Sequence, residues 1–125
     1  MATAFAVFCA TDGSLTFYNR DSVPSVGDTF EGKVVSNVYT GFVSYNYSDE
    51  SYVPWYNERA NIYTIFFTDE FATVKPISTA YWFYEVSWVE IFDAKNLDTS
   101  RVTNMQSMFY DFGAHLNILD LHKLM

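Results

Sequence analysis

The side chains of this sequence that could carry chemistry are 2 histidines, 1 cysteine and 15 acidic residues. His115 and His122 lie seven positions apart, and an aspartate stands close to each, Asp111 and Asp120. Imidazole nitrogens and carboxylate oxygens both coordinate zinc, so these side chains could ligate a metal. Their spacing fits no recognised metal motif. We therefore interpret the two histidines as ordinary residues and expect no bound metal.

The acidic residues include two adjacent pairs, Asp49-Glu50 and Asp69-Glu70. Hydrolysis by paired carboxyl groups needs one group on each side of a cleft, whereas neighbouring residues of a strand point to opposite faces. Cys9 would need a histidine brought to it by the fold to act as a nucleophile, and its apolar neighbours are typical of a core cysteine. The sequence contains no glycine-rich phosphate loop. We therefore expect no enzyme and no cofactor.

The charge of the chain restricts its partners. Acidic residues outnumber lysine and arginine by 15 to 7, which gives a formal net charge of −8. A nucleic-acid backbone is bound by clustered Lys and Arg, so we expect no direct contact with nucleic acid. An acidic surface instead attracts a basic protein partner, or serves only to keep an aromatic-rich chain soluble.

The first residues, MATAFAVFCATDG, form a short apolar run that ends at the turn pair Asp12-Gly13. They lack the basic start of a signal peptide, and no segment reaches the roughly 18 apolar residues of a membrane span. We interpret this run as a strand and expect no membrane insertion. The chain as written is then cytoplasmic, or a mature fragment given a new Met. With one cysteine, no internal disulfide forms.

The first half of the chain is typical of short strands separated by turns. Asp12-Gly13 predicts the turn of a first hairpin. Gly41 interrupts a stretch rich in β-branched and aromatic residues, which predicts two strand segments or one bulged strand. The predicted strands lie at 4–9, 15–18, 33–47 and 62–67, and the predicted loops at 19–32 and 48–61.

In the second half a triplet recurs, because WFY at 82–84 matches MFY at 108–110 at an offset of 26. A period in the twenties is typical of solenoid repeats, whose units each leave an apolar face for a neighbour. The apolar residues at 105, 108, 109 and 112 are spaced like one face of a helix of about two turns. Asn104 suits the N-cap of that helix and Gly113 the position after its end.

Aromatic residues make up 20% of the chain, with 12 Phe, 10 Tyr and 3 Trp. Tyr and Trp are enriched at binding hot spots, but most large rings of a thin domain fill its core. We expect Trp82 and Phe83 in the core, and partial exposure for Trp55, Tyr56 and Trp88. Binding of a carbohydrate by stacked aromatic rings is a weaker alternative to protein binding.

The stretch LDTSRVTNMQSMFYDF closely resembles the LDTS-x-VTNM-x-x-MFY-G-C motif of the BspA-like leucine-rich-repeat surface proteins of bacteria. TDGSLTFY and the segment WYNERANIYTIFF onward resemble the N-terminal region of the same family, so the resemblance covers nearly the whole chain. It implies a non-enzymatic adhesin or interaction protein that binds host or matrix proteins. Glu85-Val86 and Asp111-Phe112 replace the usual Gly-Cys in the two repeats.

We therefore predict a single α+β domain over residues 1–125. Its strand-rich part covers residues 1–76 and runs into short leucine-rich-repeat-like units at 77–125, whose edge at 116–125 predicts a homodimer or a docked partner. The predicted function is protein–protein interaction; the alternative is a small acidic inhibitor of a nucleic-acid-handling protein, an anti-CRISPR-like nucleic-acid mimic. The predicted binding residues are Trp55, Tyr56, Trp88, Asp49, Glu50, Glu85 and Asp111.

Overall fold

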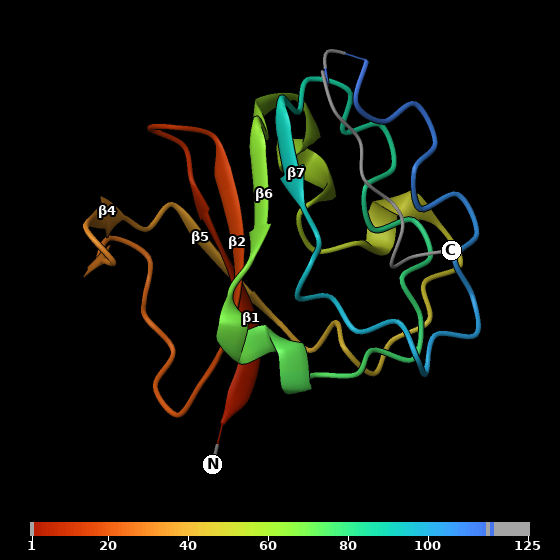
Figure 1. The fold of residues 1–125 in the computed structure, drawn as a ribbon. Helices are drawn as coiled ribbons and strands as arrows, with labels where there is room; N and C mark the ends of the chain where they lie inside the picture. The colour runs from red at the N-terminus through yellow and green to blue at the C-terminus, as the bar shows by residue number, and fades with distance from the viewer. Residues whose placement is uncertain (1, 115, 117–125) are drawn as a thin grey trace.

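The computed structural model describes residues 2–114 and residue 116, and its centre is one mixed sheet (Figure 1). The five strands lie in the order β5-β1-β2-β6-β7. Their bounds are Thr3–Cys9 for β1, Ser14–Arg20 for β2, Asn37–Thr40 for β5, Thr64–Phe67 for β6 and Ile91–Asp93 for β7. Strand β1 runs antiparallel to β2 and β5, whereas β6 runs parallel to both β2 and β7.

Short elements connect these strands. They are the two-stranded hairpin of β3 (Thr29–Phe30) and β4 (Lys33–Val34), and the 3-10 helices η1 (Glu50–Tyr52), η2 (Tyr56–Asn61) and η3 (Asp69–Thr73). A mixed sheet with a few short helices is a small α+β or mostly-β domain, and the predicted fold class is confirmed at that level. Among the described residues, no helix is both long and apolar enough to cross a membrane.

The predicted first hairpin is confirmed, since β1 and β2 pair along their whole length. Asp12 Oδ1 accepts a hydrogen bond from the N–H of Ser14 at 3.0 Å, which fixes the turn. Gly13 adopts a φ of +69°, and a Cβ there would lie 2.7 Å from the carbonyl oxygen of Asn61. Only glycine fits such a place. The carbonyl of Gly13 accepts from the N–H of Tyr63 at 2.7 Å, which ties the hairpin to the start of β6.

Residues 33–47 contain two strand segments, one of the two predicted alternatives, but the break is not at Gly41. The second segment ends at Thr40, so the strand predicted over 41–47 does not form. The N–H of Val35 donates to the carbonyl of Asp28 at 2.9 Å, so Val35 stays with the β3–β4 hairpin. The N–H of Ser36 donates to the carbonyl of Phe8 at 2.9 Å, so the chain has already joined β1. The break therefore lies where the chain passes from the hairpin to the main sheet.

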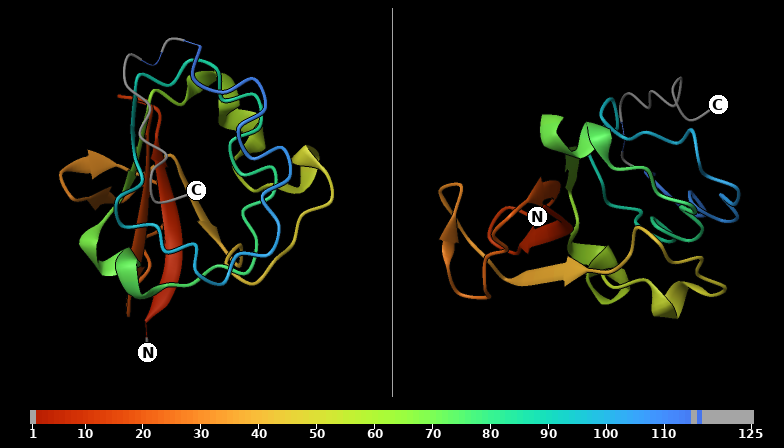
Figure 2. Two further views of the ribbon diagram at one scale, coloured as in Figure 1. Left: turned by 45° about the vertical axis from the view of Figure 1, so that its right-hand side comes forward. Right: turned by 90° about the horizontal axis from the view of Figure 1, so that it is seen from below.

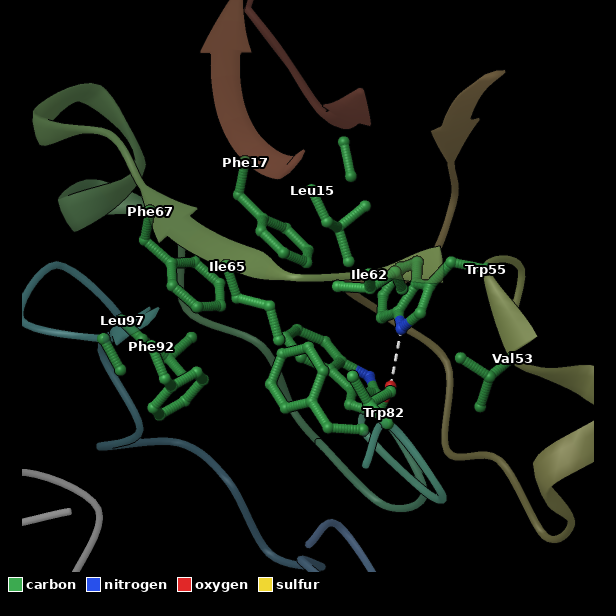
Figure 3. Close-up of a cluster of buried hydrophobic side chains, with 14 of the residues drawn as sticks. Leu15, Phe17, Val53, Trp55, Ile62, Ile65, Phe67, Trp82, Phe92 and Leu97 are labelled. Atoms are coloured by element: carbon green, nitrogen blue, oxygen red, sulfur yellow. Dashed lines mark hydrogen bonds between the residues drawn. The ribbon is translucent and has the colours of Figure 1, made fainter. Parts of the chain in front are cut away.

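The main core lies between one face of the sheet and the segments that cover it (Figure 3). The strand predicted at 62–67 forms as β6 over Thr64–Phe67, but it is buried on one face only: Ile65 and Phe67 are fully buried, whereas Phe66 is 36% exposed. Phe17 of β2 is central to this core, because its ring stacks on Phe67 with centroids 4.2 Å apart and meets Trp55 edge-on at 5.4 Å. Each such aromatic pair contributes about 0.5–1.5 kcal/mol beyond the area it buries.

Trp55 was predicted to be partly exposed, and that prediction is wrong, because the side chain is fully buried. Its indole N–H donates to the carbonyl oxygen of Trp82 (Figure 3). The ring therefore brings a large apolar surface into the core without leaving its one donor unpaired. The predicted core positions of Trp82 and Phe83 are confirmed, with exposed fractions of 1% and 0%.

A second, smaller core lies on the other face of the sheet, toward the β3–β4 hairpin (Figure 1). Its buried residues are Phe5, Val7, Cys9, Tyr18 and Val35. The expectation that Cys9 is a core residue is confirmed. Burial raises the pKa of its thiol, which keeps the sulfur protonated and poorly nucleophilic at neutral pH.

Candidate binding face

Two segments after η3 run side by side and are joined by a ladder of backbone hydrogen bonds (Figures 1 and 2). We name residues 77–86 the first coil and residues 103–113 the second coil. The N–H groups of Thr79, Tyr81, Phe83 and Glu85 donate to the carbonyls of Asn104, Gln106, Met108 and Tyr110 at 3.1, 3.0, 3.0 and 2.7 Å. The intervening N–H groups of Trp82, Tyr84 and Val86 donate to carbonyls three residues earlier in the same coil.

The two coils begin with the same capped turn, 26 residues apart, which is the offset predicted from the sequence. In the first coil the N–H of Ala80 donates to Ser78 Oγ at 3.1 Å. In the second coil the N–H of Gln106 donates to Asn104 Oδ1 at 2.9 Å. Asn104 is therefore a capping residue, as predicted, but it caps a turn and not a helix.

The helix predicted over residues 105–112 does not form. Ser107 and Asp111 adopt φ values of +54° and +51°, and Tyr81 and Glu85 of the first coil adopt +63° and +60°. Left-handed residues interrupt a right-handed helix. In the second coil the carbonyls of Asn104, Gln106 and Met108 accept from the first coil and not from N–H groups four residues later, so no run of i→i−4 bonds is made. Consecutive four-residue turns return side chains to the core every three or four positions, which is the spacing that had indicated a helix.

The outward side chains of both coils repeat a tyrosine followed by an acidic residue, Tyr84-Glu85 and Tyr110-Asp111. The rings of Tyr84 and Tyr110 are stacked, with centroids 4.6 Å apart and planes inclined by 13°. Tyr110 is 56% exposed, so much of this stack is open to a partner. The coils therefore present rigid aromatic surface with a carboxylate beside each ring.

Helix η2 adds a third tyrosine and a cation to this surface. The hydroxyl of Tyr56 donates to Glu85 Oε1 at 2.8 Å, and its ring centroid lies 6.4 Å from that of Tyr84. The guanidinium carbon of Arg59 lies 4.0 Å from the centroid of the Tyr56 ring, and Arg59 Nε lies 4.0 Å from Glu85 Oε1. Tyr81 completes the group, since its ring centroid is 5.7 Å from that of Tyr84. Glu50 lies close enough for its charge to act on Tyr56 and Tyr84. We name the whole set the tyrosine face: Glu50, Tyr56, Arg59, Tyr81, Tyr84, Glu85, Tyr110 and Asp111.

The carboxylates of the tyrosine face act on its hydroxyl groups. The hydrogen bond to Glu85 raises the pKa of Tyr56, burial and the charge of Glu50 raise it further, and Arg59 opposes them. Burial raises the pKa of Tyr84, and the charges of Glu50 and Glu85 add to that effect. Both phenols therefore stay neutral donors at physiological pH, beside carboxylates that make the local potential negative.

The structure places the predicted binding residues in four different environments. Tyr56, Glu50, Glu85 and Asp111 lie on the tyrosine face. Asp49 instead caps η1, where its Oδ1 accepts from the N–H of Ser51 at 2.8 Å. Trp88 is 49% exposed, as predicted, between the first coil and β7. Trp55 lies in the core and has no exposed surface.

Sequence reasoning did not select Tyr84, Tyr110 or Arg59. The first two form the centre of the tyrosine face, and the signal for them was present, because they occupy equivalent positions of the predicted repeat. A polar or amphipathic residue that recurs at one position of a solenoid faces outward when its neighbours face the core. Arg59 lies 26 residues before Glu85, and no local pattern in the sequence indicates their proximity.

In residues 2–114 and 116, no three His, Cys, Asp or Glu side chains are grouped to hold a metal ion. The two histidines weighed for a metal site, His115 and His122, lie outside the described residues, as does Asp120. The predicted dimer edge at 116–125 also lies outside them, except for Leu116.

No protein-family model, curated protein or solved structure matches this chain. The tyrosine face is therefore the feature of the described residues from which a function is argued.

Proposed function

We propose that this chain is a non-enzymatic protein-binding module whose tyrosine face takes a basic, arginine-bearing segment of a partner protein. The observation that carries the proposal is the repeated pair of Tyr84-Glu85 and Tyr110-Asp111, with the two rings stacked. Tyrosine gives a large contact area at low cost in side-chain entropy. Rings that are already stacked lose little further freedom on binding, which favours affinity.

The chain contains an internal example of the contact that we propose. Arg59 lies over the ring of Tyr56 and beside the carboxylate of Glu85. Guanidinium groups stack on aromatic faces and pair with carboxylates. Tyr110 and Asp111 offer the same two chemical groups one coil further along. A partner arginine over Tyr110 would repeat the arrangement that Arg59 makes with Tyr56.

The charge of the chain supports a basic partner. The tyrosine face has three carboxylates, Glu50, Glu85 and Asp111, against one guanidinium, and the chain as a whole carries a formal charge of −8. A negative surface speeds association with a positive partner and lowers affinity for acidic ones. The same charge favours the second candidate, an inhibitor that occupies the basic nucleic-acid site of another protein. Both candidate functions involve a basic partner, and they differ in how much the aromatic rings contribute to the affinity.

The stacked coils also support an interpretation as leucine-rich-repeat-like units. Strands β6 and β7 are parallel, and their register begins with Thr64 opposite Ile91. The first coil follows β6 and the second coil follows β7, and both coils contain the same turn hydrogen bonds and residues with left-handed φ. The sequence resemblance to BspA-like surface proteins supports the same class of function, recognition of a protein by a repeat surface. We include adhesin-type recognition in the proposal on that ground.

The proposal is tested by titrating the ¹⁵N-labelled chain with three short peptides that are identical except for Arg, Lys or Glu at the same positions. The expected result is that the Arg peptide shifts amides of both coils and η2, the Lys peptide does so more weakly, and the Glu peptide does not. Tyr110→Ala should remove the response, whereas Tyr52→Ala should not, although Tyr52, which lies outside the face, is the more exposed of the two tyrosines. Equal responses to all three peptides would contradict the proposal.

A further inference from the structure

A concave surface is lined by residues between β5 and the end of η1. Figure 2 shows the backbone of this segment in gold to yellow. The concave surface encloses about 520 Å³, which is within the range of small-molecule sites. Its lining residues are Thr40, Gly41, Tyr45, Asn46, Tyr47, Ser48 and Tyr52. None of these seven residues is charged, although charged residues make up 18% of the chain. We name this surface the neutral hollow.

Three tyrosines supply the apolar area of the neutral hollow. Tyr45 and Tyr52 are 59% and 68% exposed, and Tyr47 is 6% exposed. The rings of Tyr45 and Tyr47 are stacked, with centroids 5.0 Å apart and planes inclined by 20°. The buried ring therefore supports the exposed one, which leaves the second face of Tyr45 open. At Gly41, no atom lies within 4 Å of the place where a Cβ would be, so the backbone there is open to a ligand.

Asn46 supplies oriented hydrogen-bond donors, and the repeat coils fix their direction. The N–H of Gln106 can only donate, so the atom of Asn104 that it meets at 2.9 Å is an acceptor, Oδ1. Asn104 Nδ2 must then donate, and it does so to Asn46 Oδ1 at 2.9 Å. The hydroxyl of Ser78 also meets Asn46 Oδ1, at 2.9 Å.

Asn46 Oδ1 is thus fixed as the acceptor for Asn104 Nδ2, and the hydroxyl of Ser78 is shared between it and the carbonyl oxygen of Asn104 at 3.2 Å. Asn46 Nδ2 carries two N–H groups that are not used within the described part of the chain. An exposed amide whose carbonyl is held in this way offers donors in a fixed direction. Hydroxyl groups of Ser48, Thr40 and Tyr52 add groups that both donate and accept.

We propose that the neutral hollow binds a neutral sugar, a hexopyranose unit at the end of or within an oligosaccharide. A pyranose presents C–H groups on its faces, which suit the open rings of Tyr45 and Tyr52, and hydroxyls at its edge, which suit the amide of Asn46. No lining residue carries a positive charge that would attract phosphates, sulfates or uronic acids. Asp49 and Glu50 follow directly in the chain and repel such anions. This site is separate from the tyrosine face and does not depend on the function proposed for it.

The test is a glycan array probed with the full chain, followed by calorimetry with the neutral oligosaccharides maltohexaose, cellohexaose, mannohexaose and chitohexaose, and with trigalacturonate as an anionic probe. We expect binding of at least one neutral sugar and none of trigalacturonate. Tyr45→Ala and Tyr52→Ala should each weaken that binding about tenfold, which corresponds to about 1.4 kcal/mol, because each variant removes a ring face on which the sugar packs.

Asn46→Asp is the sharpest variant, because a carboxylate keeps the acceptor for Ser78 and Asn104 and removes both N–H donors. It should lose sugar binding while the free energy of unfolding changes little. Tyr110→Ala is the matched control, and it should bind sugar as the unmodified chain does even where it loses a protein partner. The proposal is overturned if no neutral glycan binds, or if binding survives in both tyrosine variants.

Discussion

Tyr84 and Tyr110 stack face to face at a centroid distance of 4.6 Å, although 26 residues of chain separate them. Two positions earlier, Trp82 and Met108 are separated by the same number of residues and are both buried, each with 1% exposure. The repeat thus places one residue of each unit in the core and another on the surface. The stack stabilises the contact between the coils and forms the centre of the tyrosine face.

A double-mutant cycle measures this contact. Tyr84→Ala and Tyr110→Ala should each lower the free energy of unfolding, and the pair should show a coupling of about 0.5–1.5 kcal/mol, because each variant alone already removes the stack. Urea unfolding followed by circular dichroism gives the four values. Tyr52→Ala combined with Tyr110→Ala should be additive, since those rings are not in contact. Additivity of the first pair would show that the stack is energetically irrelevant.

Gly13 is predicted to be the least replaceable glycine of the chain. Gly13→Ala should lower the free energy of unfolding by about 3 kcal/mol. A residue with a Cβ in the left-handed conformation contributes about 1–2 kcal/mol of this loss, and overlap of the Cβ with Tyr63 and Asn61 contributes about 1–3 kcal/mol. Gly32→Ala is the matched control, because Gly32 has a φ of +79° and nothing within 4 Å of the added Cβ. Gly32→Ala should lower the free energy of unfolding only by the contribution of the left-handed backbone. Thermal unfolding of both variants checks this, and equal losses would contradict the packing described at Gly13.

Substitution of the buried Trp55 should lower the free energy of unfolding much more than substitution of the exposed Trp88. Trp55→Ala removes a fully buried ring and should cost about 3–5 kcal/mol, whereas Trp88→Ala should cost less than about 1 kcal/mol. Trp55→Phe keeps most of the packing and loses the hydrogen bond to Trp82, so it provides a measurable value if the alanine variant does not fold. Acrylamide quenching of fluorescence checks the exposure directly. A Trp88→Ala variant that retains strongly quenched tryptophan fluorescence would contradict the burial of Trp55.

Stability should fall at alkaline pH in part because of Tyr47. Burial and the neighbouring Tyr45 raise the pKa of Tyr47 to about 12, against about 10 in an unfolded chain. The folded state therefore holds this proton more tightly than the unfolded state. Its contribution to the free energy of unfolding is complete below pH 10 and is lost as the pH rises toward 12.

The measurement for Tyr47 is urea unfolding at intervals between pH 9 and pH 11, for the unmodified chain and for Tyr47→Phe. Other titrating groups contribute equally to both curves, so the difference between them reports Tyr47 alone. The unmodified chain should lose stability more steeply above pH 10. Parallel curves would show that the hydroxyl of Tyr47 titrates equally in both states.

Local patterns predicted the features whose causes are local. Asp12 and Gly13 supply the side-chain acceptor and the left-handed backbone of the first turn, and both are visible in the sequence. The offset between the coils was predictable for a related reason, since Trp82 and Met108 fill equivalent core positions. Strand β6 was predictable because it is apolar and bounded by turn residues.

The errors arose where distant residues decide the structure. Trp55 is buried because its indole reaches Trp82, a contact 27 residues away in sequence. The helix expected at 105–112 shares its spacing of apolar residues with a series of turns, and its left-handed positions carry Ser107 and Asp111, not glycine. Which backbone forms there depends on whether a neighbouring coil donates N–H groups to the carbonyls of this segment, and that is a property of the assembled fold.

The central claim is that the tyrosine face binds a basic protein. The most direct measurement is a quantitative pull-down with the tagged chain at low and moderate salt, comparing the unmodified protein with a Tyr84→Ala/Tyr110→Ala variant and with Tyr52→Ala, and identifying bound proteins by mass spectrometry. We predict basic proteins that are retained by the unmodified chain and by Tyr52→Ala, are lost from the double variant, and bind more weakly as salt rises. Retention of the same proteins by the double variant would contradict the claim.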